Sequence, residues 1–285
     1  MAYKNRERLK EYNFSLSPEN KQPGTSALLR IKNEEDKIFY CLASILDVFD
    51  EIVFINNGSL DRTAAIVREF QEQFDPTGKI KAYVYPFRIA RLGPEHFNTP
   101  ADSVHSIVYY YNWGLSLCTR TWVFKWDGDM VLNAAAKPSF LRHMRDVQAE
   151  PESCWWLCGQ TVYRDPAGAF YLATDEMPGE IRFFPNGGNP RFHKRDLHEV
   201  LRRRPRLKMI QTENEPLFYE LKFTDVDEFS HWGLAEIPTP RKQREQRNFK
   251  LVKSGQADEG PFQKLPATFL DDQISAGPAG LRPSS

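Results

Sequence analysis

The sequence has no run of about 18 consecutive apolar residues, the length that a membrane-spanning helix requires. Its first residues, MAYKNRERLKEYNF, lack the apolar centre of a signal peptide. The sequence also lacks an excess of charge, since 38 lysines and arginines balance 38 aspartates and glutamates. A neutral chain has no overall field that would attract nucleic acid or an anionic membrane. We therefore expect a cytoplasmic protein with no nucleic-acid partner and no transmembrane segment, while peripheral association with a membrane stays open.

Cysteine is scarce as well, with four residues in 285. The four cysteines lie in apolar segments and do not have the spacing of a zinc site. They are Cys41, Cys118, Cys154 and Cys158. This pattern predicts reduced, buried thiols, as in proteins of the cytosol.

Polar segments stand at both ends of the chain. Residues 1–25 are rich in Lys, Glu, Asn and Pro, and we predict a mobile arm or a short leading helix there. From about Pro238 the chain carries PTPRKQREQRN and later SAGPAGLRPSS, which predicts a basic segment and a flexible tail over residues 236–285. Residues 26–235 remain as one large domain, long enough to bury a sizeable core.

Between the ends, apolar runs alternate with amphipathic stretches. Strands are predicted in SALLRIK, DEIVFIN, KIKAYVYPF and TWVFKW. Helices are predicted in NEEDKIFYCLASILDVF, DRTAAIVREFQEQF and ADSVHSIVYYYNWGLSLC, where apolar residues recur at helical spacing. Further on, WWLCGQTVYRD and AFYLA each read as one strand. This alternation predicts an α/β fold with a doubly wound, mostly parallel sheet flanked by helices, and such sheets bind ligands beyond the carboxyl ends of their strands.

Two aspartates follow an apolar strand in the stretch TWVFKWDGDMVL. A D-x-D pair alone is weak, and the copy at Asp225 and Asp227 lies in a polar segment where a helix N-cap is the simpler explanation. At Asp127 and Asp129, Gly128 would let the backbone turn so that both carboxylates face one point. Neighbouring carboxylates raise each other's pKa unless a cation neutralises them, and Mg²⁺ or Mn²⁺ is the natural partner. The pattern predicts a metal site that holds a diphosphate, with a solvated turn as the alternative.

Three ordered segments carry a family resemblance: ALLRIKNEEDKIFYCLASIL, DEIVFINNGSLDRTAAI and YNWGLSLCTRTWVFKWDGDM. Together they resemble the nucleotide-sugar half of inverting family 2 glycosyltransferases, which have the GT-A fold. The lipopolysaccharide-core and capsule type is the most similar, because its first strand also ends in K-N-E-E. The resemblance covers about residues 26–132, and more loosely an acceptor half over residues 133–235.

The resemblance implies which residues meet the donor, a nucleotide-diphosphate sugar. Asp127 and Asp129 match the motif that binds metal and diphosphate, and Asn57 stands in or beside the place of an aspartate that reads the base. Two departures matter: N-N-G-S stands where D-D-G-S is usual, and Tyr111 replaces a basic residue. The expected donor-binding residues are Arg30, Lys32, Asn33, Asn57, Ser59, Asn112, Asp127 and Gly128. Taken alone, Asn33 would be read as a helix N-cap.

The second half must supply a base that takes a proton from the acceptor hydroxyl. In the related enzymes an R-x-F stretch precedes a His-Glu pair in the acceptor pocket, and PRFHKRDLHEVL resembles it. We predict Glu199 as the base, with Asp196 as the runner-up. His198 is the candidate for a further metal ligand. His231 ranks below it, because packing beside Trp232 is the simpler explanation for that histidine.

The expected function is a metal-dependent glycosyltransferase that moves a sugar to a hydroxyl of a glycan or glycolipid, with inversion implied by the resemblance alone. A nucleotidyltransferase on sugar phosphates is an alternative, but the N-terminal part has no Gly-rich phosphate loop followed by a basic residue. A catalytically silent glycan-binding protein of the same fold is another, and the N-N-G-S change favours it.

Overall fold

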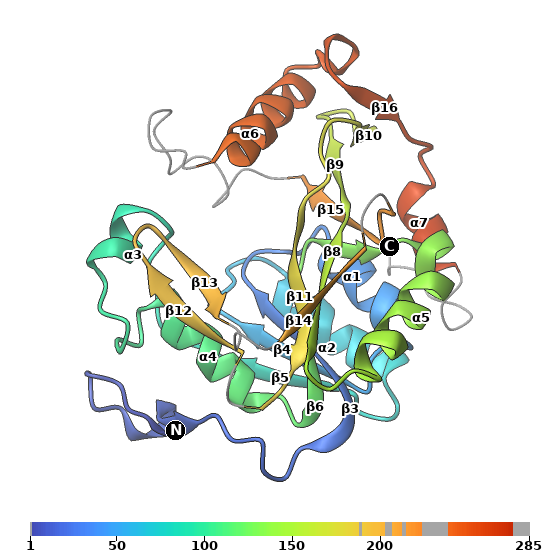
Figure 1. The fold of residues 1–285 in the computed structure, drawn as a ribbon. Helices are drawn as coiled ribbons and strands as arrows, with labels where there is room; N and C mark the ends of the chain where they lie inside the picture. The colour runs from blue at the N-terminus through green and yellow to red at the C-terminus, as the bar shows by residue number, and fades with distance from the viewer. Residues whose placement is uncertain (1, 188–189, 203–206, 213–214, 224–238, 276–285) are drawn as a thin grey trace.

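The computed structural model describes residues 2–187, 190–202, 207–212, 215–223 and 239–275, which form a mixed α/β protein (Figure 1). Its main sheet has seven strands in the order β14-β8-β11-β6-β3-β4-β5. These strands are β3 (Gln22–Ile31), β4 (Glu51–Asn56), β5 (Ile80–Val84), β6 (Arg120–Trp126), β8 (Ser153–Cys158), β11 (Gly179–Pro185) and β14 (Lys208–Thr212). Only β11 runs against its neighbours, so the predicted α/β class and mostly parallel sheet are confirmed.

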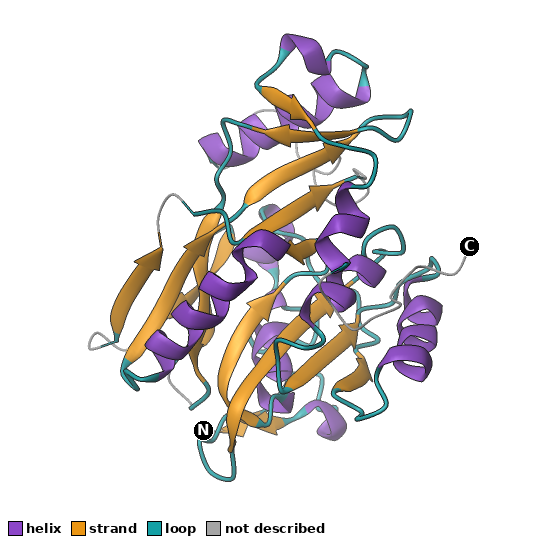
Figure 2. Cartoon of the chain, turned by 90° about the vertical axis from the view of Figure 1, so that its right-hand side faces the viewer, coloured by secondary structure: helices purple, strands orange, loops and turns teal. Residues whose placement is uncertain are grey.

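Helices cover both faces of the main sheet (Figure 2). Alternate side chains of β3 point to opposite faces, so that Leu29 packs in one core cluster and Leu28 in another. The first cluster includes residues of α1 (Ile38–Ile45), α2 (Thr63–Phe74) and α5 (Lys137–Gln148), which follows η2 (Ala134–Ala136). The second includes residues of α4 (Ile107–Leu117). The sheet is therefore doubly wound, as its alternating pattern predicts.

A second sheet has five strands in the order β16-β10-β9-β15-β7. They are β7 (Met130–Leu132), β9 (Gln160–Arg164), β10 (Phe170–Ala173), β15 (Phe218–Lys222) and β16 (Phe262–Lys264). The predicted single strand in WWLCGQTVYRD is wrong, because β8 ends before Gly159 and β9 starts the second sheet after it. A Cβ atom at Gly159 would lie 2.4 Å from the ring of Phe218, so only glycine fits where the chain changes sheets.

The first residues form neither a mobile arm nor a leading helix. Strand β1 (Ala2–Tyr3) pairs with β2 (Phe14–Ser15), and η1 (Lys10–Tyr12) lies between them. The ring of Phe14 packs on that of Tyr109 at 5.1 Å, which attaches this segment to α4. A few aromatic contacts therefore order a segment whose average composition is polar.

The tail predicted from about Pro238 is also structured over residues 239–275. It forms α6 (Pro240–Lys253), η3 (Ala257–Glu259), β16 and α7 (Phe269–Ile274). Phe249 and Val252 are buried in a small cluster with Tyr163, although the rest of α6 is strongly charged. Two buried apolar side chains are too few to show in a composition window, so the helix could not be predicted from the sequence pattern. Residues 276–285 lie outside the described residues.

A two-stranded hairpin completes the fold. Strand β12 (Arg191–Arg195) pairs with β13 (His198–Arg202), and the short helix α3 (Pro94–Asn98) lies beside it (Figure 1). The end of the hairpin contacts α3, since the amide of Gly93 donates to the carbonyl of Leu197. Among the described residues, no helix combines the length and the apolar character that crossing a bilayer requires.

Candidate active site at the junction of two sheets

Asp127, Gly128 and Asp129 form the turn through which the chain leaves the main sheet for the second one. Strand β6 ends at Trp126, and β7 begins at Met130. A Cβ atom on Gly128 would lie 2.4 Å from Cδ1 of Ile31 and 3.2 Å from Cγ of Glu34. Glycine is therefore needed here for space against the end of β3 and the loop that follows it.

Asp127 is held by cations of the main sheet. Nη1 of Arg182 on β11 donates to its Oδ2 at 2.7 Å, and Nη2 of Arg30 on β3 donates to its Oδ1 at 3.2 Å. Nζ of Lys125 lies 4.0 Å away. Burial raises the pKa of Asp127, but Lys125, Arg182 and Arg30 outweigh it and hold that pKa well below its usual range. Asp127 is thus an ionised carboxylate.

Asp129 is held by the second sheet instead. Nζ of Lys222 on β15 donates to its Oδ2 at 2.6 Å. The backbone amide of Leu221 donates to the carbonyl of Asp129 at 2.8 Å. The two aspartates therefore contact different sheets, although a single residue separates them.

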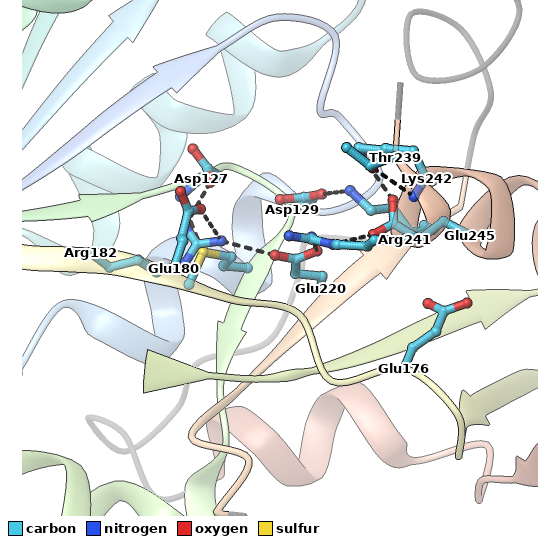
Figure 3. A network of polar contacts seen from close by, with 12 residues as sticks. Asp127, Asp129, Glu176, Glu180, Arg182, Glu220, Thr239, Arg241, Lys242 and Glu245 are labelled. Carbon is cyan, nitrogen blue, oxygen red and sulfur yellow. Dashed lines mark hydrogen bonds and ion pairs between the residues drawn. The ribbon is translucent and has the colours of Figure 1, made fainter. Parts of the chain in front are cut away.

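A buried network of charges continues from this turn (Figure 3). Arg182 also contacts Glu180 at 2.8 Å and Glu220 at 2.9 Å. Glu220 in turn accepts from Arg241 of α6 at 3.2 Å. The side chains of Arg182 and Glu220 are 2% and 5% exposed, so each depends on its partners for the stabilisation that water would give. The network joins both sheets to α6.

Two arginines at the turn keep unused hydrogen-bond donors. Nε and Nη1 of Arg30 and Nε of Arg182 are buried and have no hydrogen-bond partner in the described part of the chain. The guanidinium of Arg30 lies 3.4 Å above the ring of Tyr111, which fixes its plane. Buried donors without partners are costly, and an anionic ligand would satisfy them. The turn is therefore suited to binding an anion such as a diphosphate.

The side chains around the turn do not fit a resident divalent ion. Both oxygens of Asp127 accept from arginines, and Oδ2 of Asp129 accepts from Lys222. Two unit charges 4 Å apart interact by about 4 kcal/mol at an effective dielectric constant of about 20, and a divalent ion beside an ammonium group would meet about twice that repulsion. Within the described residues, no group of three or more His, Cys, Asp or Glu side chains could hold a metal.

The hairpin β12–β13 brings Glu199 to the site and leaves the nearby His198 and Asp196 exposed. Burial raises the pKa of Glu199, while Lys125 and Arg30 are close enough to oppose that shift. His198 precedes it on the strand, points to the other side of the hairpin and is exposed. Asp196 is exposed at the turn, with a φ of 38°. His198 is thus not brought together with Asp127 and Asp129 as a metal ligand, while His231, Asp225 and Asp227 lie outside the described residues.

Asn33 and Ser59 connect two loops at the edge of the main sheet. The amide of Asn33 donates to Oγ of Ser59 at 3.0 Å, and Oδ1 of Asn33 accepts from the amide of Leu60 at 2.8 Å. Asn33 has a φ of 56° and lies before the helix, since α1 begins at Ile38. Asn33 is therefore not a helix N-cap, and the loops after β3 and β4 are held together. Lys32 is exposed and directly follows β3.

Asn57 and Asn112 use their amide groups on the backbone. Nδ2 of Asn57 donates to the carbonyls of Tyr85 and Phe87 at 2.9 and 2.8 Å. Asn112 is 1% exposed and exchanges two hydrogen bonds with the backbone of Phe192 on β12. Asn112 therefore positions the hairpin that carries Glu199.

The cations that pair with the two aspartates are not among the residues predicted from the sequence. Arg182 and Lys222 lie two residues after a glutamate, in GEIRFFP and FYELKF. Because alternate residues of a strand share a face, each pattern places opposite charges side by side within an apolar strand. That pattern was the available signal for buried ion pairs.

Comparison with known proteins gives a match over part of the chain. Residues 26–85 match the family model described as glycosyl transferase family 2. No curated protein matches the chain. The mannosyltransferase PcManGT from Pyrobaculum calidifontis, in complex with GDP-Man and Mn²⁺, is 17% identical over 51% of this chain and 37% of that chain, with a TM-score of 0.36.

Two further solved structures are similar at the same level. Glucosyl-3-phosphoglycerate synthase from Mycobacterium tuberculosis, in complex with phosphoglyceric acid, is 16% identical over 50% of this chain and 44% of that chain, with a TM-score of 0.32. TarS from S. aureus is 10% identical over 69% of this chain and 60% of that chain, with a TM-score of 0.41. The chain spans 37% to 60% of the length of these structures. The sequence match to glycosyl transferase family 2 rests on residues 26–85, the segment that includes Arg30, β4 and β5.

Proposed function

We propose that the protein is a family 2 glycosyltransferase that transfers a hexose from a nucleotide-diphosphate sugar to a hydroxyl of a glycan or glycolipid, with inversion. The match over residues 26–85 supports the family. The observation that carries the proposal is the pair of buried guanidinium groups, Arg30 and Arg182, whose unused N–H groups lie beside the turn at the carboxyl end of β6.

The donor's diphosphate would accept hydrogen bonds from Arg30 and Arg182. Charge-assisted bonds of this kind are stronger than neutral ones, and a buried site strengthens them further. Asn57 would read the base with Oδ1, because its Nδ2 already donates to two backbone carbonyls. An Oδ1 atom accepts an N–H of the base, as the carboxylate of the related enzymes would.

Glu199 would act as the catalytic base. Its carboxylate takes the proton from the acceptor hydroxyl while the hydroxyl oxygen forms a bond to the anomeric carbon. The bond from that carbon to the diphosphate oxygen breaks, and its electron pair leaves with the nucleoside diphosphate. A single displacement of this kind inverts the anomeric centre. The raised pKa of Glu199, caused by burial, makes it a stronger base than an exposed glutamate.

A panel of uridine, guanosine and thymidine diphosphate sugars tests the proposal with the Glu199→Gln variant. We expect at least one donor to bind both proteins with the same Kd, and transfer or hydrolysis by the variant to fall by about 10²- to 10⁴-fold. Glu152→Gln is the control, because Glu152 is exposed before β8. Full turnover by Glu199→Gln would move the base elsewhere, and a panel in which no donor binds would reject the glycosyltransferase.

A further inference from the structure

We propose that Lys222 supplies the positive charge at Asp129 that a divalent ion was expected to supply, so that donor binding requires neither Mn²⁺ nor Mg²⁺. This inference rests on the proposed function, because it concerns the same donor site. Its starting point is the 2.6 Å contact between Nζ of Lys222 and Oδ2 of Asp129.

The backbone holds these two residues in register. Strand β15 pairs antiparallel with β7, with Glu220 opposite Met130. The amide of Leu221 donates to the carbonyl of Asp129 at 2.8 Å, one residue from the ion pair. The side chains of Lys222 and Asp129 are 9% and 14% exposed. The ammonium group is therefore fixed at Asp129 by strand pairing as well as by charge, and a metal would have to displace a buried, tethered cation.

The neighbouring carboxylates are also neutralised. Four carboxylates at this junction have a cationic nitrogen within 2.9 Å, namely Asp127, Asp129, Glu180 and Glu220. A divalent ion such as Mg²⁺ binds in proteins through carboxylates that face it directly. Carboxylates already paired with Lys and Arg have little remaining negative charge to attract one.

The charge of the diphosphate has a separate counterpart in the arginines. Arg30 and Arg182 retain buried N–H donors that no described residue accepts. A guanidinium presents several donors in one plane and suits phosphate oxygens without a metal between them. Lys222 balances Asp129, and the unused N–H groups of Arg30 and Arg182 remain for the ligand.

Titration calorimetry of the full chain with UDP, GDP and dTDP, in EDTA and in Mn²⁺, tests the inference. We expect the Kd of the best nucleoside diphosphate to agree within about two-fold between the two conditions. Lys222→Met removes the ammonium group that pairs with Asp129. The variant should bind the nucleoside diphosphate at least about ten-fold more weakly in EDTA, and its affinity should recover in Mn²⁺. Lys222→Arg keeps the charge and should bind in EDTA. Lys208→Met is the matched control, because Lys208 forms an ion pair with Glu150 while 63% exposed.

The outcomes separate this inference from the proposed function. Binding by the unmodified protein only in Mn²⁺ would overturn the role of Lys222 and leave the glycosyltransferase standing. Binding in neither condition would overturn both. Should Lys222→Met fail to fold, electron paramagnetic resonance of Mn²⁺ with the unmodified protein and diphosphate decides: we expect the signal of Mn²⁺ with diphosphate alone, and immobilisation of the ion by the protein would contradict us.

Discussion

At the scale of single residues, Asn57 shows how hydrogen bonding decides which side chain a site can use. Its Nδ2 group donates to the carbonyls of Tyr85 and Phe87, on the loop that follows β5. A carboxylate has no hydrogen to donate, and it would place negative charge against two carbonyl oxygens. The amide at this position therefore stabilises the loop, which gives a structural reason for asparagine instead of aspartate at position 57.

We expect Asn57→Asp to lower the free energy of unfolding by about 1–3 kcal/mol, since it leaves two carbonyls without their donor. Urea unfolding at neutral pH measures the change. Asn98→Asp is the matched control, because Asn98 is exposed and donates to one carbonyl, that of Pro94. A loss no larger than that of the control would mean that the two bonds to the loop contribute nothing.

Glu34 contributes a pH dependence of its own. It lies beside Gly128 and contacts Lys37 at 2.6 Å. Burial, with the nearby Asp129, raises the pKa of Glu34 to about 7 despite Lys37. The folded protein therefore binds this proton more tightly than the unfolded chain does, and the stabilisation is present below the unfolded pKa and lost as the pH rises toward 7.

We expect the difference in unfolding free energy between the unmodified protein and Glu34→Gln to fall by about 1–3 kcal/mol between pH 4.5 and 7. Urea unfolding across this range measures it. Glu95→Gln should show no such fall over this range, because hydrogen bonding to Arg91 lowers the pKa of Glu95 to about 2, and its stabilisation is lost only as the pH falls below about 4. A flat difference for Glu34→Gln would show that folding does not raise the pKa of Glu34.

At the scale of elements, the passage from β8 to β9 depends on one glycine. A Cβ at position 159 would lie 2.4 Å from the ring of Phe218 and 2.5 Å from its carbonyl oxygen. We expect Gly159→Ala to cost about 1–3 kcal/mol of stability by overpacking, measured by urea unfolding. Gly187→Ala is the control, because its Cβ would meet Pro18 at an ordinary 3.5 Å. Equal stability of the two variants would show that the strands adjust freely.

Strands β3 to β6 and helices α1, α2 and α4 could be predicted from the sequence because each depends on local pattern. Strands β3, β4, β5 and β6 are apolar runs, and the helices between them repeat at helical spacing. The break at Gly159 could not be predicted, since its cause is Phe218, far along the chain. Helix α6 likewise depends on the packing of Phe249 and Val252 in a cluster with Tyr163, which is distant in the sequence.

The site was predictable in part, for the same reason. The position of Asp127 and Asp129 at a strand end follows from local pattern, and so does the glycine between them. The identity of their partners does not, because Arg182 and Lys222 reach the turn only through the pairing of β11 with β6 and of β15 with β7. Two opposite charges separated by one residue in a strand indicate a buried ion pair. The pattern does not show which further carboxylate the cation contacts.

At the scale of the whole molecule, Arg182 connects the parts. It binds Asp127 of the turn, Glu180 of its own strand and Glu220 of the second sheet, and Glu220 binds α6 through Arg241. We expect Arg182→Met to lower the unfolding free energy by about 3–5 kcal/mol, because it leaves buried carboxylates unpaired. Chemical unfolding followed by tryptophan fluorescence measures it.

The control for this prediction is an exposed arginine in an ion pair of similar length. Arg88 contacts Glu95 at 2.7 Å and is 69% exposed, so Arg88→Met should change stability by less than about 1 kcal/mol. If Arg182→Met cost no more than this control, the buried network would not hold the sheets together.

The three-residue turn at Asp127 has a mechanical consequence. Asp127 is bound to the main sheet and Asp129 to the second sheet. Any sliding of one sheet against the other therefore changes the distance between the two carboxylates and between their attached cations. A diphosphate has a fixed span between its phosphorus atoms, so it would fit only one alignment of the layers. A bound ligand of that span would therefore hold the two sheets in a single relative position.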